Sequence, residues 1–255
     1  MYTQNLPMRF ARAMTTPRFA AGVLASLTLL AAACSESASH LTSPPQVSGA
    51  SNKSIATASN FAVLANAAVT CTDGTVTGDV GTFQADPVGS VTRTTCPMSS
   101  PVHVGDGVAQ LAFNNFLGTY TALAPKPEDV CTTLTGTLDG VTLSPGAYCF
   151  DVAATVTGLL TLDGPSNGMW IFKIGTSGTG ALTGTGFSVA MAGGGKACNV
   201  TWWVADAVTM TGSAFQGNIL AGVAITLTGG TLNGHASSRS DVTITGTAVT
   251  ACEGG

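Results

Sequence analysis

The C-terminal part of the chain reads Thr209-Met210-Thr211-Gly212, then Thr226-Leu227-Thr228-Gly229 and then Thr243-Ile244-Thr245-Gly246. Each copy begins 17 residues after the one before it. A short strand-like motif that returns at a constant interval is typical of a solenoid, in which successive coils stack on one another. We therefore predict that each copy is one strand of one coil.

Four earlier copies extend the repeat at wider spacings. They are Thr75-Val76-Thr77-Gly78, Thr133-Leu134-Thr135-Gly136, Thr155-Val156-Thr157-Gly158 and Ala181-Leu182-Thr183-Gly184, in which Ala replaces the first Thr. Because these copies lie between 22 and 58 residues apart, we expect the early coils to be irregular.

Side chains alternate between the two faces of a strand, so the apolar residue of each motif points inward and both threonines point outward. The Gly after each motif marks a corner of the coil. The predicted inward columns are Val208, Ile225 and Val242; Met210, Leu227 and Ile244; and Phe215, Leu232 and Val249. The candidate functional face consists of Thr75, Thr77, Thr133, Thr135, Thr155, Thr157, Thr183, Thr209, Thr211, Thr226, Thr228, Thr243 and Thr245.

The composition also favours a regular β-structure. Only 9% of the 255 residues are charged and 32 are Gly, whereas 45% are hydrophobic. Disordered chains are rich in charge and poor in apolar residues, so disorder throughout is excluded. Without the first 33 residues, six Lys and Arg remain against 13 Asp and Glu, a net charge of about −7. An acidic chain without a basic patch is unsuited to nucleic acid or to electrostatic binding of anionic lipid.

Residues 1–33 have the features of an export signal. Three arginines precede an apolar run over residues 19–33, which is short for a transmembrane span. The run ends in Leu30-Ala31-Ala32-Ala33-Cys34, which resembles a bacterial lipobox with Cys34 as the lipidated first residue of the mature protein. The alternative is an ordinary signal peptide cleaved after Ala31-Ala32-Ala33.

The rest of the chain is predicted to be a flexible linker at residues 35–52, which contains Pro-Pro and small polar residues, and a single domain at residues 53–255. We expect the protein to be exported, as a cell-surface or outer-membrane lipoprotein or otherwise secreted. Its contact with the membrane would then be through the lipid anchor only.

An even number of cysteines in an exported chain indicates disulfides. Fifteen pairings are possible for the six that follow Cys34. We favour pairing between neighbours: Cys71 with Cys96, Cys131 with Cys149, and Cys198 with Cys252. A metal site is disfavoured, because no C-x-x-C spacing occurs and no His lies beside a cysteine pair.

One segment has helical rather than strand periodicity. Apolar residues recur at helical spacing over residues 104–123, and Pro125 and Pro127 follow. The stripe consists of Val108, Leu111, Ala112, Phe116, Tyr120 and Leu123. We predict a helix whose apolar stripe packs along the β-body rather than forming a ligand site.

Several motifs, in order along the chain, resemble a known family. They are Asn60-Phe61-Ala62-Val63-Leu64-Ala65, Thr77-Gly78-Asp79-Val80-Gly81, Leu143-Ser144-Pro145-Gly146-Ala147-Tyr148-Cys149-Phe150, Ile171-Phe172-Lys173-Ile174-Gly175, Ala197-Cys198-Asn199-Val200 and Phe215-Gln216-Gly217-Asn218-Ile219-Leu220-Ala221. Over residues 55–252 the chain resembles the microbial ice-binding proteins of the DUF3494 type. It departs from that family at Asn233-Gly234-His235, where Asn-Gly-Arg is common, and at Ala181, which interrupts the threonine pattern.

The resemblance implies an all-β fold: a discontinuous, right-handed β-solenoid of triangular section with one long helix alongside. Family members use one flat face to adsorb to ice. They are secreted or surface-attached, and they are not enzymes. The implied partners are an ice crystal surface and ordered water, with no cofactor, no metal and no nucleic acid, and we expect a monomer.

The threonine pattern independently suits an ice surface. A grid of threonines on parallel strands repeats about every 4.8 Å across the strands and about every 6.7 Å along them, a scale comparable with an ice lattice. Each threonine presents a methyl and a hydroxyl group on a side chain with restricted rotation.

Two other functions remain open. A surface adhesin or envelope module would use the solenoid as a tethered spacer and bind glycan or nothing. A polysaccharide-acting enzyme would need two facing carboxylates, for which Asp206 and Asp241 are the nearest candidates, but no aromatic platform accompanies them. His103 and His235 have no partners at catalytic spacing.

Overall fold

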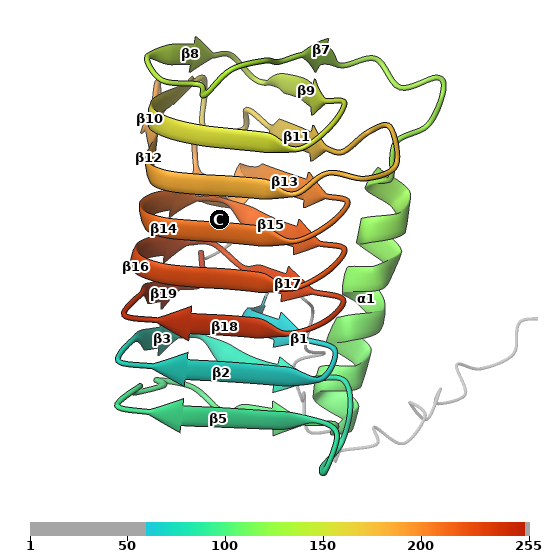
Figure 1. Cartoon of the computed structure of the whole chain (residues 1–255), viewed down its shortest axis with the longest axis vertical. Coiled ribbons are helices and arrows are strands. Elements are labelled where there is room, and N and C mark those ends of the chain that lie inside the picture. Colours follow the sequence, from blue (N-terminus) through green and yellow to red (C-terminus); the bar gives the residue numbers. More distant parts are fainter. Residues whose placement is uncertain (1–59, 253–255) are drawn as a thin grey trace, which may run out of the picture. The chain divides into compact units, whose positions relative to one another are not determined.

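The computed structural model describes residues 60–252. Its strands form two parallel sheets that run the length of one stacked body (Figure 1). The predicted export signal, Cys34 and the linker lie outside the described residues. Within residues 60–252, no helix is both long and apolar enough to cross a membrane.

Sheet A has nine strands. In spatial order they are β6 (Val102–Val104), β4 (Asp79–Thr82), β1 (Phe61–Ala65), β17 (Ala236–Ser238), β15 (Asn218–Ala221), β13 (Val200–Val204), β11 (Trp170–Ile174), β9 (Gly146–Phe150) and β7 (Thr132–Thr133). A short 3-10 helix, η2 (Ala197–Asn199), precedes β13.

Sheet B has ten strands. Along its main path they are β5 (Ser90–Thr94), β2 (Ala68–Thr72), β18 (Val242–Thr245), β16 (Ile225–Asn233), β14 (Val208–Gln216), β12 (Leu182–Ala192), β10 (Ala154–Asp163) and β8 (Val141–Leu143). The other two, β19 (Ala248–Thr250) and β3 (Thr75–Thr77), pair with each other, and β19 also pairs with β16.

Sheet B covers two sides of the body because its long strands bend in the middle. The bend is a column of left-handed residues whose φ angles lie between 49° and 72°: Thr95, Asp73, Gly246, Gly229, Gly212, Gly186 and Gly158. Five of the seven are Gly, which adopts this conformation without steric cost. The corner predicted after the motif is confirmed at Gly158, Gly212, Gly229 and Gly246. It is wrong at Gly184, which pairs with Met210 inside the strand, and the corner of that coil is Gly186. Together with sheet A, the two halves of sheet B give a three-sided section.

The coils are discontinuous in sequence, as expected from the resemblance. Strand β17 pairs with β1, and β18 pairs with β2, so the last coil rests on coils formed by the first part of the chain. In Figure 1 the front strands run leftward while the chain descends from β10 to β18, which makes the winding right-handed. The seam between β18 and β2 thus joins residues far apart in the sequence.

The predicted inward columns are confirmed. Val208 pairs with Ile225, which pairs with Val242, and all three are fully buried. The columns through Met210 and Phe215 are also buried, and each is in register. An aromatic stack fills the upper core, where the rings of Phe172 and Trp202 lie 3.9 Å apart.

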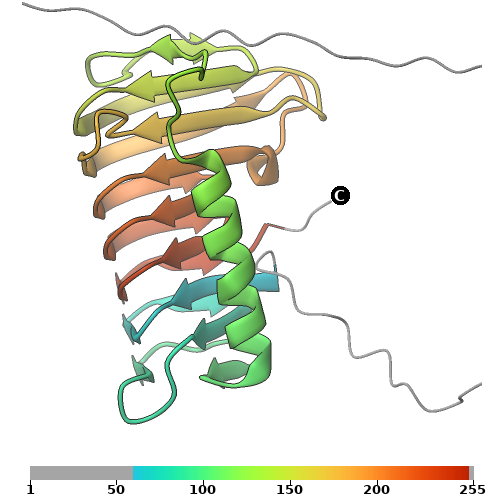
Figure 2. The same cartoon turned by 90° about the vertical axis from the view of Figure 1, so that its right-hand side faces the viewer.

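Helix α1 (Gly107–Leu123) lies along the outer face of sheet A (Figure 2). It begins later than predicted, because residues 102–104 form β6 and Asp106 caps the helix by accepting from the backbone N–H groups of Val108 and Ala109. Burial acts to raise the pKa of Asp106, but hydrogen bonds from the Ala109 N–H group, from His103 and from the Val108 N–H group together outweigh it and lower that pKa.

The buried stripe of α1 differs in part from the predicted one. It consists of Ala109, Ala112, Phe113, Phe116 and Tyr120, whereas Leu111 is 42% exposed. The Tyr120 hydroxyl donates to the carbonyl oxygen of Val204, and the Trp203 indole donates to the carbonyl oxygen of Tyr120. These bonds fix the helix to sheet A.

All three predicted disulfides are present. Cys71 is bonded to Cys96, Cys131 to Cys149, and Cys198 to Cys252, with Cα atoms 5.9, 5.8 and 5.5 Å apart. The last of these connects the end of the final coil to the 3-10 helix that precedes β13.

Candidate functional site: the threonine face

Two columns of threonine cover one side of the body, and we call this side the threonine face. The strands that carry it are β5, β2, β18 and the first halves of β16, β14, β12 and β10. The first column is Thr92, Thr70, Thr243, Thr226, Thr209, Thr183 and Thr155. The second is Thr94, Thr72, Thr245, Thr228, Thr211, Thr185 and Thr157, of which Thr157 lies at a register irregularity.

Most of the predicted threonines are brought together here. Thr155, Thr157, Thr183, Thr209, Thr211, Thr226, Thr228, Thr243 and Thr245 all lie in the two columns.

Four predicted threonines lie elsewhere. Thr75 and Thr77 are on β3, which pairs with β19 on the third side of the body. The structure places their motif between the corner at Asp73 and the next turn at Gly78, which leads into β4 of sheet A. Thr133 pairs with Cys149 in sheet A, and Thr135 lies in the loop after β7, beside a hollow that Thr155 also lines. Assigning these four to the threonine face was wrong.

Five threonines of the face were missed: Thr70, Thr72, Thr92, Thr94 and Thr185. The first four lie in alternating segments, but Asp73 and Thr95 stand where the motif has Gly. Thr185 follows the motif directly. The alternation of residues 68–72 is the signal that could have located Thr70 and Thr72, whereas Arg93 takes the apolar position between Thr92 and Thr94 and obscures that copy.

The threonine side chains are open to solvent. Each of the fourteen is exposed or half-buried, while the alternate positions on β18, β16 and β14 are buried. Their hydroxyl groups have no hydrogen bond to another residue within the described part of the chain, so they are available to water. Neither column contains a charged residue.

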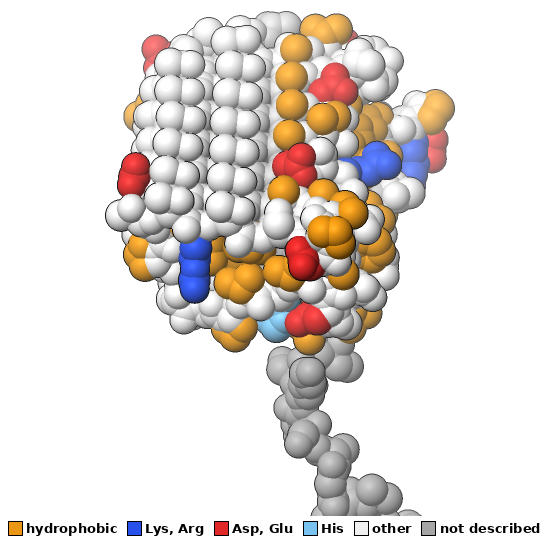
Figure 3. Space-filling model, turned by 60° about the horizontal axis from the view of Figure 1, so that its bottom comes forward, with side chains coloured by type: hydrophobic (Ala, Val, Ile, Leu, Met, Phe, Trp, Pro, Cys, Tyr) orange, Lys and Arg blue, Asp and Glu red, His pale blue; other side chains and the backbone are white. Residues whose placement is uncertain are grey.

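A third column of outward positions lies beside the threonines, two residues earlier on each strand. It consists of Ser90, Ala68, Asp241, Ala224, Ala207, Ala181 and Ala153, and we call it the alanine column. Figure 3 shows the threonine columns as parallel rows of white atoms, beside a row of apolar side chains that an acidic side chain interrupts.

The third side of the body lacks this regularity. Its outward positions include Leu159, Ser188, Ala214, Thr231 and Thr75, and farther along the strands Gln216, Asn233 and Thr250. The amide of Asn233 donates to that of Gln216, so these side chains bond to each other. Among residues 60–252, only the threonine face repeats one side chain at every coil.

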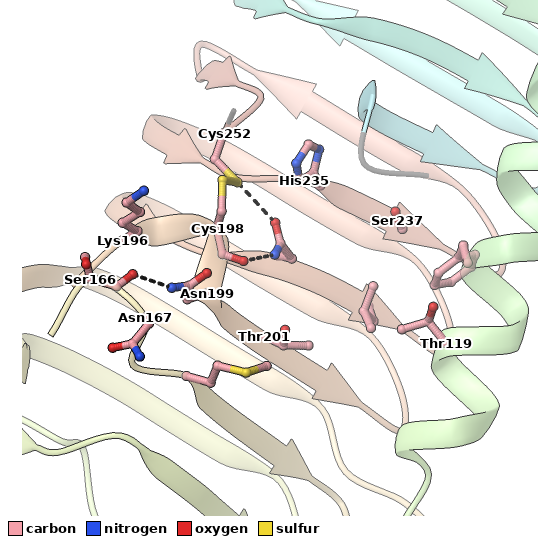
Figure 4. Close-up of a pocket in the computed structure, with 14 residues that line it drawn as sticks. Thr119, Ser166, Asn167, Lys196, Cys198, Asn199, Thr201, His235, Ser237 and Cys252 are labelled. Carbon is pink, nitrogen blue, oxygen red and sulfur yellow. Dashed lines mark hydrogen bonds between the residues drawn. A yellow bond between two sulfur atoms is a disulfide. The ribbon is translucent and has the colours of Figure 1, made fainter. Parts of the chain in front are cut away.

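A groove of about 660 Å³ lies on the outer face of sheet A, beside α1 (Figure 4). Its lining residues include His235, Asn218, Thr201 and Lys196. Burial lowers the pKa of His235, whose ring Nδ1 lies 2.7 Å from the carbonyl oxygen of Phe61. Within the described residues, no group of three or more His, Cys, Asp or Glu could hold a metal ion.

The carboxylates considered for hydrolysis serve the backbone. Asp206 accepts a hydrogen bond from the backbone N–H of Gly180 at 2.8 Å, and Asp241 accepts one from that of Ala68 at 2.9 Å. Each therefore ties its own turn to a neighbouring coil.

Comparison with known proteins identifies the fold. A family model described as Ice-binding-like matches residues 63–250. A search of curated protein sequences finds no match. Among solved structures, an ice-binding protein from the Antarctic ascomycete Antarctomyces psychrotrophicus has 30% identity and a TM-score of 0.70, with 77% of this chain and 97% of that chain covered.

Two further structures agree. An ice-binding protein from an Antarctic biological consortium has 30% identity and a TM-score of 0.69, with 77% of this chain and 89% of that one covered. One from an Antarctic Flavobacteriaceae bacterium has 35% identity and a TM-score of 0.66, with 76% of this chain and 45% of that longer chain covered. On the family match and these alignments, the chain belongs to the ice-binding-like family.

Proposed function

We propose that this protein adsorbs to ice through the threonine face. The observation that carries the proposal is the stacking of fourteen threonines in two columns on one side of the solenoid, in register everywhere except at Thr157. Family membership and the ice-binding function of the matched proteins support it.

The geometry provides a regular template for water. Seven strands about 4.8 Å apart make each column about 29 Å long, and the columns lie about 6.7 Å apart. Each threonine offers a hydroxyl that can anchor a water molecule and a methyl that can shape an ordered layer above it. Because the β-branched side chains are held on a hydrogen-bonded sheet, adsorption orders few additional degrees of freedom.

The absence of charge in the two columns also favours ice. A charged group binds its own hydration shell strongly and resists transfer out of liquid water. The face therefore presents only neutral groups that can share the hydrogen-bond network of the solid.

We also propose that residues 1–33 export the chain, that Cys34 carries a lipid, and that the protein acts as a monomer. The lipobox-like sequence before Cys34 supports the anchor. Metabolic labelling with palmitate should mark the protein and should not mark a Cys34→Ala variant.

The test of the ice-binding site compares two variants that change the same motif. Thr228→Tyr places a bulky ring at the centre of the second column, whereas Thr77→Tyr changes the equivalent position of a motif on the third side. We expect Thr228→Tyr to lose ice shaping, thermal hysteresis and inhibition of recrystallisation, because the ring holds the flat face away from the crystal. The Thr77→Tyr variant should retain all three.

Both variants should unfold at nearly the same temperature as the parent, since exposed substitutions change stability by about 0.5 kcal/mol or less. Full activity in a folded Thr228→Tyr variant would show that another surface contacts ice. An inactive parent protein that is fully folded and oxidised would instead favour the adhesin, and binding to a glycan array would then be measured.

A further inference from the structure

The alanine column continues the regular surface of the threonine face. Its backbone is in the same register: the carbonyl oxygens of Asp241, Ala224, Ala207 and Ala181 each accept from the N–H group of the adjoining strand. Ala224, Ala207 and Ala181 are half-buried and Ala153 is exposed, so their methyl groups reach the surface beside the threonine methyls.

Asp241 interrupts this column. It precedes Val242 by one residue and therefore stands beside Ala224 on one neighbouring strand and Ala68 on the other. It is the charged member of a column whose other members are alanine or serine. Its side chain is half-buried, and Ser240 Oγ lies 3.5 Å from the second carboxylate oxygen.

The position of Asp241 at the seam explains why an acceptor is present. Residues 66–68 enter the first coil here, and the amide of Ala68 donates to Asp241 Oδ1 at 2.9 Å. The amides of Asn66 and Ala67 both point at the carbonyl oxygen of Ser240. The carboxylate therefore helps to join two parts of the chain that are distant in sequence.

That structural role requires an oxygen acceptor but not a negative charge. An asparagine carbonyl oxygen can accept the same hydrogen bond as the carboxylate. A carboxylate in the plane of a surface that adsorbs to ice must either lose its hydration water or keep a hydration shell that does not match the ice lattice. Either effect opposes contact between the protein and ice.

We propose that the alanine column is a third row of the ice-contacting surface and that Asp241 limits adsorption by placing a charge in that row. The inference rests on the proposed function of the threonine face. It extends that site by one column and identifies the residue that weakens it.

The first test is Asp241→Asn, with Asp206→Asn as the matched control. Asp206 makes the same kind of hydrogen bond to a neighbouring coil, from the position just before Ala207 and outside the three columns. Thermal hysteresis and recrystallisation inhibition are measured over a concentration series, with the unfolding temperature of each variant. We expect Asp241→Asn to increase hysteresis and to lower several-fold the concentration that stops recrystallisation, while Asp206→Asn matches the parent.

The second test is Ala207→Tyr, which obstructs the alanine column without touching a threonine. It should lose most of the hysteresis while remaining folded. If the parent is active and Asp241→Asn is folded but no more active, the role of the charge is refuted. If Ala207→Tyr keeps full activity, the third row is refuted. A folded parent without activity on ice would overturn the proposed function and this extension together.

Discussion

Two glycines at the corner of the threonine face, in neighbouring coils, differ in the space available for a side chain. Substituting each by alanine tests this geometry. Gly212 has a φ angle of 58°, and a Cβ atom added there would meet no atom within 4 Å. Gly230 has a φ angle of 78°, and its Cβ atom would lie 2.1 Å from the carbonyl oxygen of Ser213. An alanine at Gly212 would be strained only by the backbone angle, whereas an alanine at Gly230 would also have no space for its methyl group.

The expected magnitudes follow from these distances. An alanine in the left-handed region costs about 1–2 kcal/mol. At Gly212 a smaller entropy loss in the unfolded chain offsets part of this, so Gly212→Ala should destabilise by about 1 kcal/mol. A contact of 2.1 Å cannot persist, so Gly230→Ala must move the backbone of β16 away from its pairing partner Ser213 on β14. We expect a loss above about 4 kcal/mol, the range in which a substitution is diagnostic.

Differential scanning calorimetry of the oxidised protein measures both effects. For a domain of this size, 1 kcal/mol corresponds to a fall of about 2–4 °C in Tm. Gly212→Ala should therefore unfold a few degrees below the parent, and Gly230→Ala at least about 8 °C below it. Gly212→Ala should also keep its ice adsorption, because its new methyl group points into open space.

Equal destabilisation by the two variants would contradict this reasoning, since the close contact at Gly230 would then have no effect. A Gly230→Ala variant as stable as the parent would show that β14 and β16 do not approach as the structure describes.

Three further predictions concern the first sheet B coil, the helix and the seam between the early and late parts of the chain. Thr95→Gly should raise the unfolding temperature, because a β-branched residue at a φ angle of 49° is strained. Relief of this backbone strain, about 1 kcal/mol, exceeds the free-energy cost of the more flexible unfolded chain. A lower Tm would contradict the assignment of Thr95 to the corner. Tyr120→Phe should destabilise by about 1–2 kcal/mol through loss of the hydrogen bond to Val204, while ice adsorption, measured in parallel, is unchanged. The free energy of unfolding should fall as the pH drops below 6.5, because burial lowers the pKa of His235 in the folded state. The unfolded state then binds a proton at a higher pH than the folded state does. The stability that the neutral His235 contributes above pH 6.5 is therefore lost as the pH falls towards its folded pKa. A His235→Gln variant that showed the same pH-dependent fall in Tm would assign this effect to other groups.

Local features of the sequence determined much of this protein. The apolar residue between two threonines fixes which side chains enter the core, because alternation is a property of any strand. Gly after the motif indicates the corner, because few other residues adopt the left-handed conformation without strain. The helix was also evident from local sequence, because its apolar residues recur at helical spacing and prolines follow it. Its start was misplaced because the cap at Asp106 was not recognised.

The tertiary structure decided which threonines share a face. The motif at Thr75 and Thr77 has the same pattern as the one at Thr226 and Thr228, with two threonines around an apolar residue and a Gly after them. It nevertheless follows a corner and lies on the third side. The strands at Thr70 and Thr92 lack the motif's Gly and nevertheless extend both columns. A motif specifies the conformation of its own strand, but its side of the coil depends on which strands it pairs with. Those pairing partners are set by burial of a core that the first strands, β1 and β2, share with the late strands β17 and β18. No single segment of the sequence encodes this pairing.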